Sequence, residues 1–263
     1  MQYAVTHPKE EILAAVEDAL QHLEGYDQEF YRRVWATEME IYCERLRAVG
    51  MVGKDHVLDA GSGNGQWTYC LSQTNGQVAA IDVNTPRLKA TEHVLEKLGV
   101  QNIEVSKQSI EKTNFPDGSF DAIFCYGVMM FCDHRVTLAE FYRLLKPGGS
   151  IYICTNGLGW YIYNVMTPHN PSDHFDVRQM AISAIRNGLA FFAEGRHPDG
   201  EQLVVPSHVL SNDAQEAGFA DLQTGPEGTL TLEPNCTPQS FFMSEFQGLE
   251  GVYELVANKS AAN

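Results

Sequence analysis

Three glycines after a short apolar segment have a spacing that could hold a ligand against the backbone. The segment VLDAGSGNGQWT covers residues 57–68 and contains Gly61, Gly63 and Gly65, with Asp59 two residues before the first glycine. Glycine permits positive φ and a close approach of a ligand to the main chain. A carboxylate beside such a loop can accept hydrogen bonds from hydroxyl or ammonium groups. The pattern indicates either a tight turn or a cofactor loop, and the surrounding segments must decide between them.

A second carboxylate, Asp82, ends the next apolar segment, QVAAID. Dinucleotide-binding folds carry an acid about 20 residues after their glycine loop, where it binds ribose hydroxyls. Their loop, however, reads G-x-G-x-x-G, and Gln66 stands where the third glycine belongs. The loop also lacks the G-K-[ST] of triphosphate-binding loops. The acid therefore fits a ribose, whereas the glycine spacing disfavours a dinucleotide.

These residues need elements that bring them to one edge of the fold. Strand-like and helix-like patterns alternate through the middle of the chain, with strands expected at 56–60, 77–82, 102–106, 120–125 and 150–155. Such alternation predicts an α/β fold with a parallel sheet and helices on both faces. In a doubly wound, Rossmann-like sheet the carboxyl ends of the strands form a crevice where ligands bind. The glycine loop and Asp82 are expected in that crevice.

The rest of the chain divides around this core. We expect N-terminal helices over residues 1–50, the second from about 27 to 49, then a cofactor-binding core over 51–155. Residues 156–203 are too long for a simple connection and are expected to form an inserted helical cap. Residues 204–263 should complete the core. The segments 220–226 and 251–259 are expected as closing strands, antiparallel because of a short linkage.

Composition limits the classes of partner. The net charge is −16 and no basic run occurs, which argues against nucleic-acid binding. No apolar stretch resembles a membrane span or a secretory signal. Six scattered cysteines without a C-x-x-C pair indicate reduced thiols and no zinc site. We expect a cytoplasmic protein with a small-molecule substrate and no nucleic-acid or membrane partner, and the sequence predicts no particular oligomeric state.

Four segments, in order, resemble the class I S-adenosylmethionine-dependent methyltransferases of the small-molecule type. They are VLDAGSGNGQWT, VAAIDVN, FPDGSFDAIFC and FYRLLKPGGSIYI, and the resemblance covers roughly residues 55–155. It implies that the chain is an enzyme with a Rossmann-like sheet, mostly parallel and with an antiparallel last strand. It also implies S-adenosylmethionine as the cofactor. No metal is expected, since the histidines and acids match no strong metal spacing.

The resemblance assigns the cofactor contacts residue by residue. The loop glycines would lie against the methionine part, and Asp59 would organise the loop or bind the ammonium group. Asp82, with Val83 beside it, would bind the ribose. Many relatives have an Asp near the adenine, but here Ser109 stands at that position, and Ile110 beside it could offer its backbone N–H and an apolar face. Cys125 and Tyr126, at the end of the fourth strand, would border the methyl end.

The acceptor side departs from the family pattern. Many relatives have a His soon after the fourth strand, whereas here the nearest is His134, which could instead be a solvated residue at a helix start. His169 and His174 in the insertion are alternative candidates for a general base. The insertion combines aromatic and polar side chains, as small-molecule pockets do, so we expect it to contribute to the substrate site. The alternative is that its aromatic side chains only pack the cap against the sheet. The candidates for the substrate site are Tyr31, Tyr126, Trp160, Tyr161, Tyr163 and Arg178.

The function expected from these residues is methyl transfer to a small molecule, with oxygen favoured as the acceptor. Nitrogen and carbon acceptors are alternatives. A protein that binds the cofactor without catalysis is another alternative, indicated by Ser109 and by the displaced His. A dinucleotide oxidoreductase is disfavoured by the glycine spacing.

Overall fold

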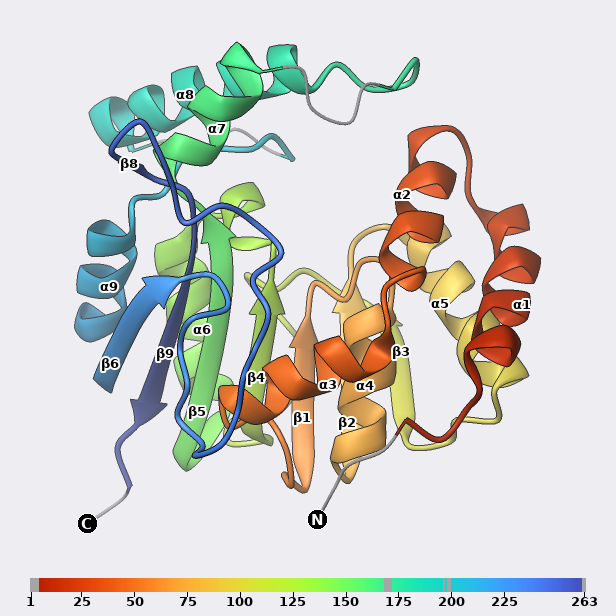
Figure 1. The fold of residues 1–263 in the computed structure, drawn as a ribbon. Coiled ribbons are helices and arrows are strands. Elements are labelled where there is room, and N and C mark those ends of the chain that lie inside the picture. Colours follow the sequence, from red (N-terminus) through yellow and green to blue (C-terminus); the bar gives the residue numbers. More distant parts are fainter. Residues whose placement is uncertain (1–4, 168–171, 196, 198–199, 262–263) are drawn as a thin grey trace.

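A seven-stranded sheet forms the centre of the computed structural model, which describes residues 5–167, 172–195, 197 and 200–261. The strand order is β3-β2-β1-β4-β5-β9-β6. Strands β1 to β5 run parallel, and β9 runs antiparallel to both β5 and β6 (Figure 1). This arrangement confirms the predicted α/β fold and its antiparallel last strand. The strands are β1 (His56–Ala60), β2 (Gln77–Asp82), β3 (Ile103–Lys107), β4 (Phe120–Tyr126), β5 (Leu145–Asn156), β6 (Phe219–Pro226) and β9 (Val252–Lys259).

Helices cover both faces of the sheet. Figure 1 shows α3 and α4 in front of the strands and α6 behind them. The described helices are α1 (Lys9–Ala19), α2 (Tyr26–Trp35), α3 (Met39–Ala48), α4 (Gln66–Thr74), α5 (Thr85–Lys97), α6 (His134–Leu144), α7 (Leu158–Met166), α8 (Val177–Glu194) and α9 (Ser207–Glu216). Short 3-10 turns η1 (Leu20–His22) and η2 (Met129–Phe131) lie between them, and a hairpin of β7 (Glu245–Phe246) and β8 (Leu249–Glu250) precedes β9.

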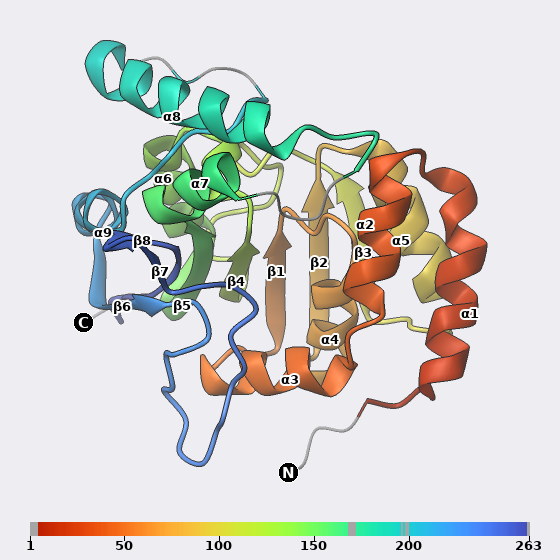
Figure 2. The same cartoon turned by 45° about the horizontal axis from the view of Figure 1, so that its top comes forward.

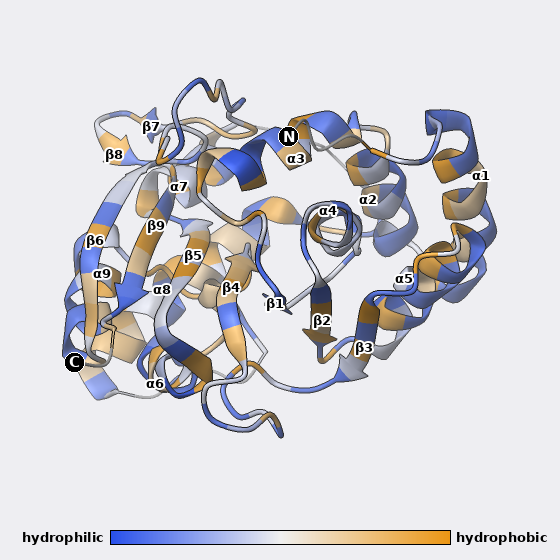
Figure 3. Cartoon of the chain, turned by 90° about the horizontal axis from the view of Figure 1, so that it is seen from below, coloured by the Kyte–Doolittle hydropathy of each residue, from blue (hydrophilic) through white to orange (hydrophobic). Residues whose placement is uncertain are grey.

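Strand side chains alternate between two hydrophobic cores. Phe124 and Tyr152 pack with α3 and α4 on one face, whereas Cys125 and Ile153 pack with α6 and α9 on the other. Because both faces are covered, the central strands are apolar at almost every position, as buried parallel strands usually are. Figure 3 shows this as hydrophobic residues concentrated on the strands. The sequence FDAIFCY therefore forms a strand although it does not alternate.

The prediction for the second N-terminal helix was wrong in its length. A single helix over 27–49 was expected, but the structure has α2 and α3 with a break at residues 36–38. Trp35 at the end of α2 points its indole N–H at the glycine loop, donating to the Asn64 carbonyl at 2.8 Å. Residues of α3, including Tyr42 and Leu46, pack across the sheet. One straight helix could not satisfy both sets of contacts, and Figure 1 shows the two helices at a large angle.

The C-terminal connection also differs from the expectation. The strands β6 and β9 do pair antiparallel, but residues 227–251 between them form a long connection that carries the β7–β8 hairpin. The antiparallel pairing was therefore predicted correctly for a wrong reason. Part of this connection reaches over α3, where the Leu232 amide donates to the Ala48 carbonyl at 2.7 Å.

A buried ionic cluster attaches this connection to the core. Arg45 on α3 is 2% exposed and donates to the carboxylates of Glu227 and Glu254, both almost fully buried. Glu254 also accepts from the Tyr152 hydroxyl at 2.8 Å, and backbone amides of the long connection donate to both acids. Every buried carboxylate oxygen thus has donors, as buried charges require. The cluster joins α3, β5, β9 and the connection between β6 and β9.

Replacing the cation of this cluster should destabilise the fold strongly. We expect Arg45→Met to lower the free energy of unfolding by about 3–5 kcal/mol, because two buried carboxylates lose their cation. Urea unfolding checks this value. Arg32→Met is the matched control, since Arg32 pairs with Glu17 and both side chains are more than half exposed. The control should change stability by about 1 kcal/mol or less, and equal losses in the two variants would contradict the role given to the cluster.

Candidate functional site

The glycine loop turns sharply between β1 and α4, at the carboxyl edge of the sheet. Gly61, Gly63 and Gly65 have φ of 82°, 52° and 80°, a region that favours glycine. A Cβ on Gly61 would collide with Val128, and one on Gly65 would collide with Thr91. At Gly63 the nearest atom to such a Cβ is 3.9 Å away. Two glycines therefore permit close packing within the protein, and the middle one faces open space where a ligand could lie.

Asp82 fixes the loop from the end of β2. Its Oδ2 accepts from the Gly63 amide at 2.9 Å, and its Oδ1 accepts from the Asn84 amide at 2.7 Å. The amides of Gly61 and Ser62 donate to the Ile81 carbonyl just before it. A carboxylate has about four lone-pair sites, so Asp82 keeps capacity for two further donors. This geometry fits the pair of ribose hydroxyls expected from the sequence.

Asp59 lies beneath the loop and not at its surface. It is 2% exposed, and its Oδ2 accepts from the Thr68 hydroxyl at 2.6 Å. Burial raises the pKa of Asp59 to about 7; the Thr68 hydrogen bond opposes this shift and the nearby charge of Asp82 adds to it. Of the two roles considered from the sequence, the contacts of Asp59 fit support of the loop.

The expected adenine side is formed by the ends of β2 and β3. Val83 follows Asp82 and its side chain is 63% exposed, which leaves an apolar surface at the crevice edge. The Ser109 hydroxyl accepts from the Glu111 amide at 3.2 Å within its own turn. Ile110 packs into the core behind the sheet with only 6% exposed, so the expected apolar contact from its side chain is wrong in this structure. Val83 is the better apolar candidate.

The expected methyl end lies after β4. Cys125 is fully buried and packs toward α6, so its side chain does not border the crevice as expected. Tyr126 points to the opposite face, where its ring lies 4.8 Å from that of Trp67 and its hydroxyl donates to Glu227 at 2.9 Å. Gly127 follows with φ of 73°, and no atom lies within 4 Å of the place that a Cβ on it would take. The sequence reasoning missed Gly127, although a glycine after the fourth strand was a visible signal.

The N-terminal helix α2 contacts the loop through Trp35. Tyr31, expected at the substrate, is fully buried with its ring against Trp35. Burial raises the pKa of Tyr31, because an ionised phenol would lose its hydration. In this conformation Tyr31 therefore packs α2 and does not line a substrate site.

The cap places its aromatic residues mainly in packing contacts. Tyr161 is fully buried and donates to the Gln202 side chain at 3.0 Å. Tyr163 packs edge-on against Phe246 of the β7–β8 hairpin. Trp160 is half-buried and lies against Tyr161. The expectation that Tyr161 lines the substrate site is wrong in this structure, while Trp160 stays a candidate.

The three histidines have different positions. His134 at the start of α6 is buried, with its Nε2 2.7 Å from Asp213 of α9, so it supports helix packing and is neither a solvated cap residue nor placed as a base. Burial lowers the pKa of His134, opposed by the charge of Asp213. His174 is exposed, 3.9 Å from Glu29. His169 lies outside the described residues, and Arg178 is exposed on α8.

A segment between α7 and α8 reaches from the cap to α2. Phe175 stacks on Tyr26 with ring centroids 4.8 Å apart, and His174 packs against Gly25. Figure 2 shows α2 and the α7–α8 pair on opposite sides above the upper ends of β1 and β4. These contacts close part of the crevice by joining two elements far apart in sequence. Such an arrangement is suited to excluding water from a bound ligand.

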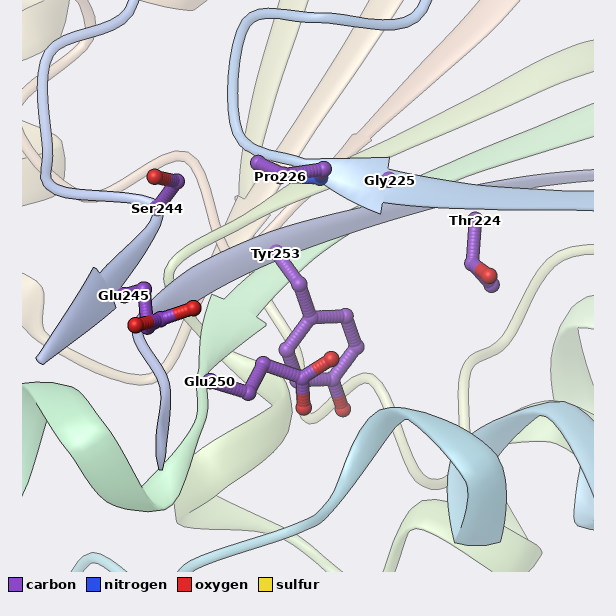
Figure 4. Close-up of a pocket in the computed structure, with 7 residues that line it drawn as sticks. All are labelled: Thr224, Gly225, Pro226, Ser244, Glu245, Glu250 and Tyr253. Carbon is purple, nitrogen blue, oxygen red and sulfur yellow. The ribbon is translucent and has the colours of Figure 1, made fainter. Parts of the chain in front are cut away.

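A separate hollow of about 290 Å³ lies at the other end of the sheet, beside β6 and β9 (Figure 4). Its Glu250 accepts from the Ser207 amide at 3.1 Å, and its Tyr253 donates to the Val205 carbonyl at 2.8 Å. These polar groups are already used within the fold, and β1 and β4 are on the far side of β5. The described residues contain no group of three potential metal ligands.

Comparison with known proteins agrees with this geometry. Residues 58–153 match a family model described as a methyltransferase domain. The ubiquinone/menaquinone biosynthesis C-methyltransferase UbiE of Pseudoalteromonas translucida is 39% identical over 115 residues, which are 42% of this chain and 46% of that protein. A demethylmenaquinone methyltransferase of Lactococcus lactis is 32% identical over 99 residues, 36% of this chain and 39% of that protein. The chain thus matches less than half the length of these relatives.

Solved structures share the fold at low identity. A geranyl diphosphate methyltransferase in complex with S-adenosylmethionine has a TM-score of 0.59 and 16% identity, covering 84% of this chain and 85% of that one. The [4+2]-cyclase SpnF has a TM-score of 0.57 and 16% identity, covering 85% and 81%. The match over residues 58–153 confirms the predicted methyltransferase resemblance, and these structures confirm the predicted fold; one of them binds S-adenosylmethionine, the cofactor expected for this chain. The cyclase shows that this fold alone does not determine the reaction.

The titration of Asp59 should appear in the stability of the ligand-free protein. Because its pKa is raised in the folded state, the carboxyl group costs stability as the pH rises from about 4 to about 7. Asp59→Asn keeps an oxygen for Thr68 but does not titrate. We expect its stability relative to the wild type to rise by up to about 4 kcal/mol between pH 4 and pH 8. Urea unfolding across this range measures it, with the exposed Asp117→Asn as control. A pH-independent difference for Asp59→Asn would refute the raised pKa.

The three glycines should separate into packing and binding positions. Gly63→Ala should abolish most S-adenosylmethionine binding, because its Cβ enters the open space at the loop, while the melting temperature moves modestly from the strained φ. Gly61→Ala should lower the melting temperature more, because its Cβ meets Val128. Calorimetric titration and thermal melts on both variants test this. Normal cofactor affinity in folded Gly63→Ala would show that the ligand does not lie beside Gly63.

Proposed function

We propose that this chain, a class I S-adenosylmethionine-dependent methyltransferase, transfers a methyl group to a carbon atom of a small, largely apolar acceptor. The observation that carries the proposal is the similarity of its cofactor half to C-methyltransferases, combined with an open glycine loop held by Asp82. By its name, the UbiE relative acts in ubiquinone and menaquinone biosynthesis, and the Lactococcus lactis relative is a demethylmenaquinone methyltransferase. An acceptor of the same chemical class, a phenol or hydroquinone with an apolar substituent, is therefore the first candidate.

The residues around the loop fit the cofactor in character. Asp82 has free lone pairs for ribose hydroxyls, Val83 gives an apolar surface for a base, and Gly63 leaves space beside the main chain. When bound, S-adenosylmethionine supplies an already reactive methyl group on its sulfonium. The chain's own task is then to hold an acceptor atom in line with that group and to exclude water. Alignment of this kind contributes several kcal/mol to a rate.

The acceptor atom proposed here, carbon, differs from the oxygen that was favoured from the sequence. Oxygen was favoured there and carbon was an alternative, whereas the UbiE relatives are C-methyltransferases. The match to the family model ends at residue 153, before the cap begins. The family match therefore does not extend to the cap, whose contacts with an acceptor are particular to this chain.

Tyr126 is the residue we assign to the acceptor. Its hydroxyl hydrogen is donated to Glu227 at 2.9 Å, so its oxygen lone pairs remain to accept a hydrogen bond from a phenolic O–H. Glu227 is held by Arg45 and by the Phe241 amide, so it is a firm anchor for Tyr126. Tyr126 would therefore orient the acceptor's hydroxyl and with it the carbon that receives the methyl group. Of the three candidate histidines, His174 alone stays open as a base within the described residues.

Methyl transfer from carbon-13 methyl-labelled S-adenosylmethionine tests the proposal. With a short-chain hydroquinone as acceptor, we expect a carbon-bound methyl group in the product, which nuclear magnetic resonance separates clearly from an oxygen-bound one. Tyr126→Phe should lower kcat/KM by about tenfold, the loss of one or two hydrogen bonds, with cofactor affinity unchanged. An oxygen-bound methyl group would contradict the carbon acceptor and support oxygen, the acceptor expected from the sequence. Cofactor binding without transfer to any phenolic acceptor would favour the non-catalytic alternative.

A further inference from the structure

Exposed large apolar side chains gather on the cap. On α8, Ile182, Leu189 and Phe192 are 46%, 71% and 50% exposed. Elsewhere on the cap Met166 of α7 is 64% exposed. The other exposed large apolar side chains of the described residues are Val83 at the crevice edge, 63% exposed, and four that are 38–48% exposed: Phe131, Val136, Leu232 and Phe242. Scattered single exposures are normal on a protein surface. Three exposed apolar side chains on one helix are not explained by the fold, because α8 already packs against the protein through its other face.

The buried and exposed faces of α8 are distinct. Ala181, Ala184 and Phe191 are buried against α7 and the core. We call the opposite side the outer face of α8, which consists of Arg178, Ile182, Arg186, Leu189 and Phe192. Figures 1 and 2 show α8 as the outermost element above the carboxyl edge of the sheet.

The charge of this face is opposite to that of the chain. The charged residues of α8 are Arg178 and Arg186, both on the outer face, and Glu194 at its last position, which is not part of that face; all three are exposed. The whole chain has a net charge of −16. The outer face of α8 is thus a basic and apolar strip on an acidic protein. Two such faces meeting across a twofold axis would bring arginines toward arginines, which disfavours a second copy as the partner.

The strip continues onto the start of α6. There Val136 is 48% exposed and the Arg135 side chain is 51% exposed, with its guanidinium 4.9 Å above the ring of Phe191. Arg135 also pairs with Asp133 at 3.5 Å, and a hollow of about 210 Å³ beside it is lined by Arg135, Phe191, Phe192 and Asp213. The continuation adds a third arginine and a recess next to the apolar side chains of α8.

We propose that the outer face of α8 docks on the surface of an anionic phospholipid bilayer. An amphipathic helix with apolar and basic side chains lies in the membrane interface with its apolar groups among the acyl chains. Arginines near the surface are attracted to anionic headgroups, while the acidic remainder of the chain is repelled and kept in water. Docking would therefore orient the cap, and the crevice beneath it, toward the bilayer.

This inference rests on the proposed function, because an acceptor with a long apolar substituent resides in the membrane. It also revises the expectation of no membrane partner, which depended on the absence of a spanning segment. No helix among the described residues is long and apolar enough to cross a bilayer. Lying on a membrane requires only one exposed face, which the sequence pattern of α8 did not reveal, since its apolar residues occur on both sides.

Vesicle flotation tests the docking. The full chain is mixed with vesicles of phosphatidylcholine alone or with a third of phosphatidylglycerol. We expect flotation with the anionic vesicles, reduced by salt. Leu189→Glu with Phe192→Glu should weaken binding by about tenfold or more, because apolar burial is lost. Arg186→Gln should weaken it by about fivefold.

The matched control is Leu232→Glu with Phe242→Glu, which makes the same exchange on the long connection after β6. It should float like the wild type. No flotation of the wild type, or equal losses in the control, would overturn the proposal. So would a wild-type dimer in light scattering that Leu189→Glu with Phe192→Glu turns into monomers, since a second copy would then occupy the face.

Methyl transfer to a water-soluble hydroquinone separates this inference from the proposed function. The α8 variant should keep that activity while losing transfer to an acceptor embedded in vesicles. Absence of all methyl transfer with intact flotation would contradict the proposed function but leave the docking surface. Intact transfer to the embedded acceptor by the α8 variant would contradict docking alone.

Discussion

The hydrogen bond from the Gly63 amide to the Asp82 carboxylate is the contact on which the site depends. At 2.9 Å it joins the turn after β1 to the end of β2, and those strands are neighbours in the sheet. It holds a backbone turn that only glycine adopts easily, and it directs the remaining lone pairs of Asp82 into the same space. Parallel pairing of β1 with β2 brings these residues together, so the sheet itself positions the site.

The rest of the molecule supports this edge of the sheet, although one of the supporting groups is buried unfavourably. A carboxyl group, Asp59, is buried under the loop, where its ionisation is unfavourable. Trp35 anchors α2 to the loop, and the Arg45 cluster anchors the long connection to the sheet. Tyr126 links that cluster to the end of β4 through Glu227. Stability elements and the expected acceptor site thus share residues, which explains why a buried ionic cluster lies so close to the crevice.

Sequence reasoning succeeded where local patterns determine structure. The strands, the glycine turn and the parallel order followed from apolar segments and glycine spacing, which act over a few residues. It failed where contacts are distant along the chain. The pairing of His134 with Asp213 spans 79 positions, and the packing of Tyr31 and Tyr161 depends on how whole helices dock. Cys125 is different: strand alternation places it opposite Tyr126, so its orientation was open to prediction and was overlooked.

The most direct test of the account is a calorimetric titration of the wild-type chain with S-adenosylmethionine and, in parallel, with NAD. We expect saturable binding of S-adenosylmethionine, because Asp82 is free to bind its ribose and Gly63 leaves space beside the main chain. We expect no measurable binding of NAD, because the loop lacks the third glycine of a dinucleotide site. Binding of NAD in preference to S-adenosylmethionine, or binding of neither, would contradict the central claim that this crevice is a methyltransferase cofactor site.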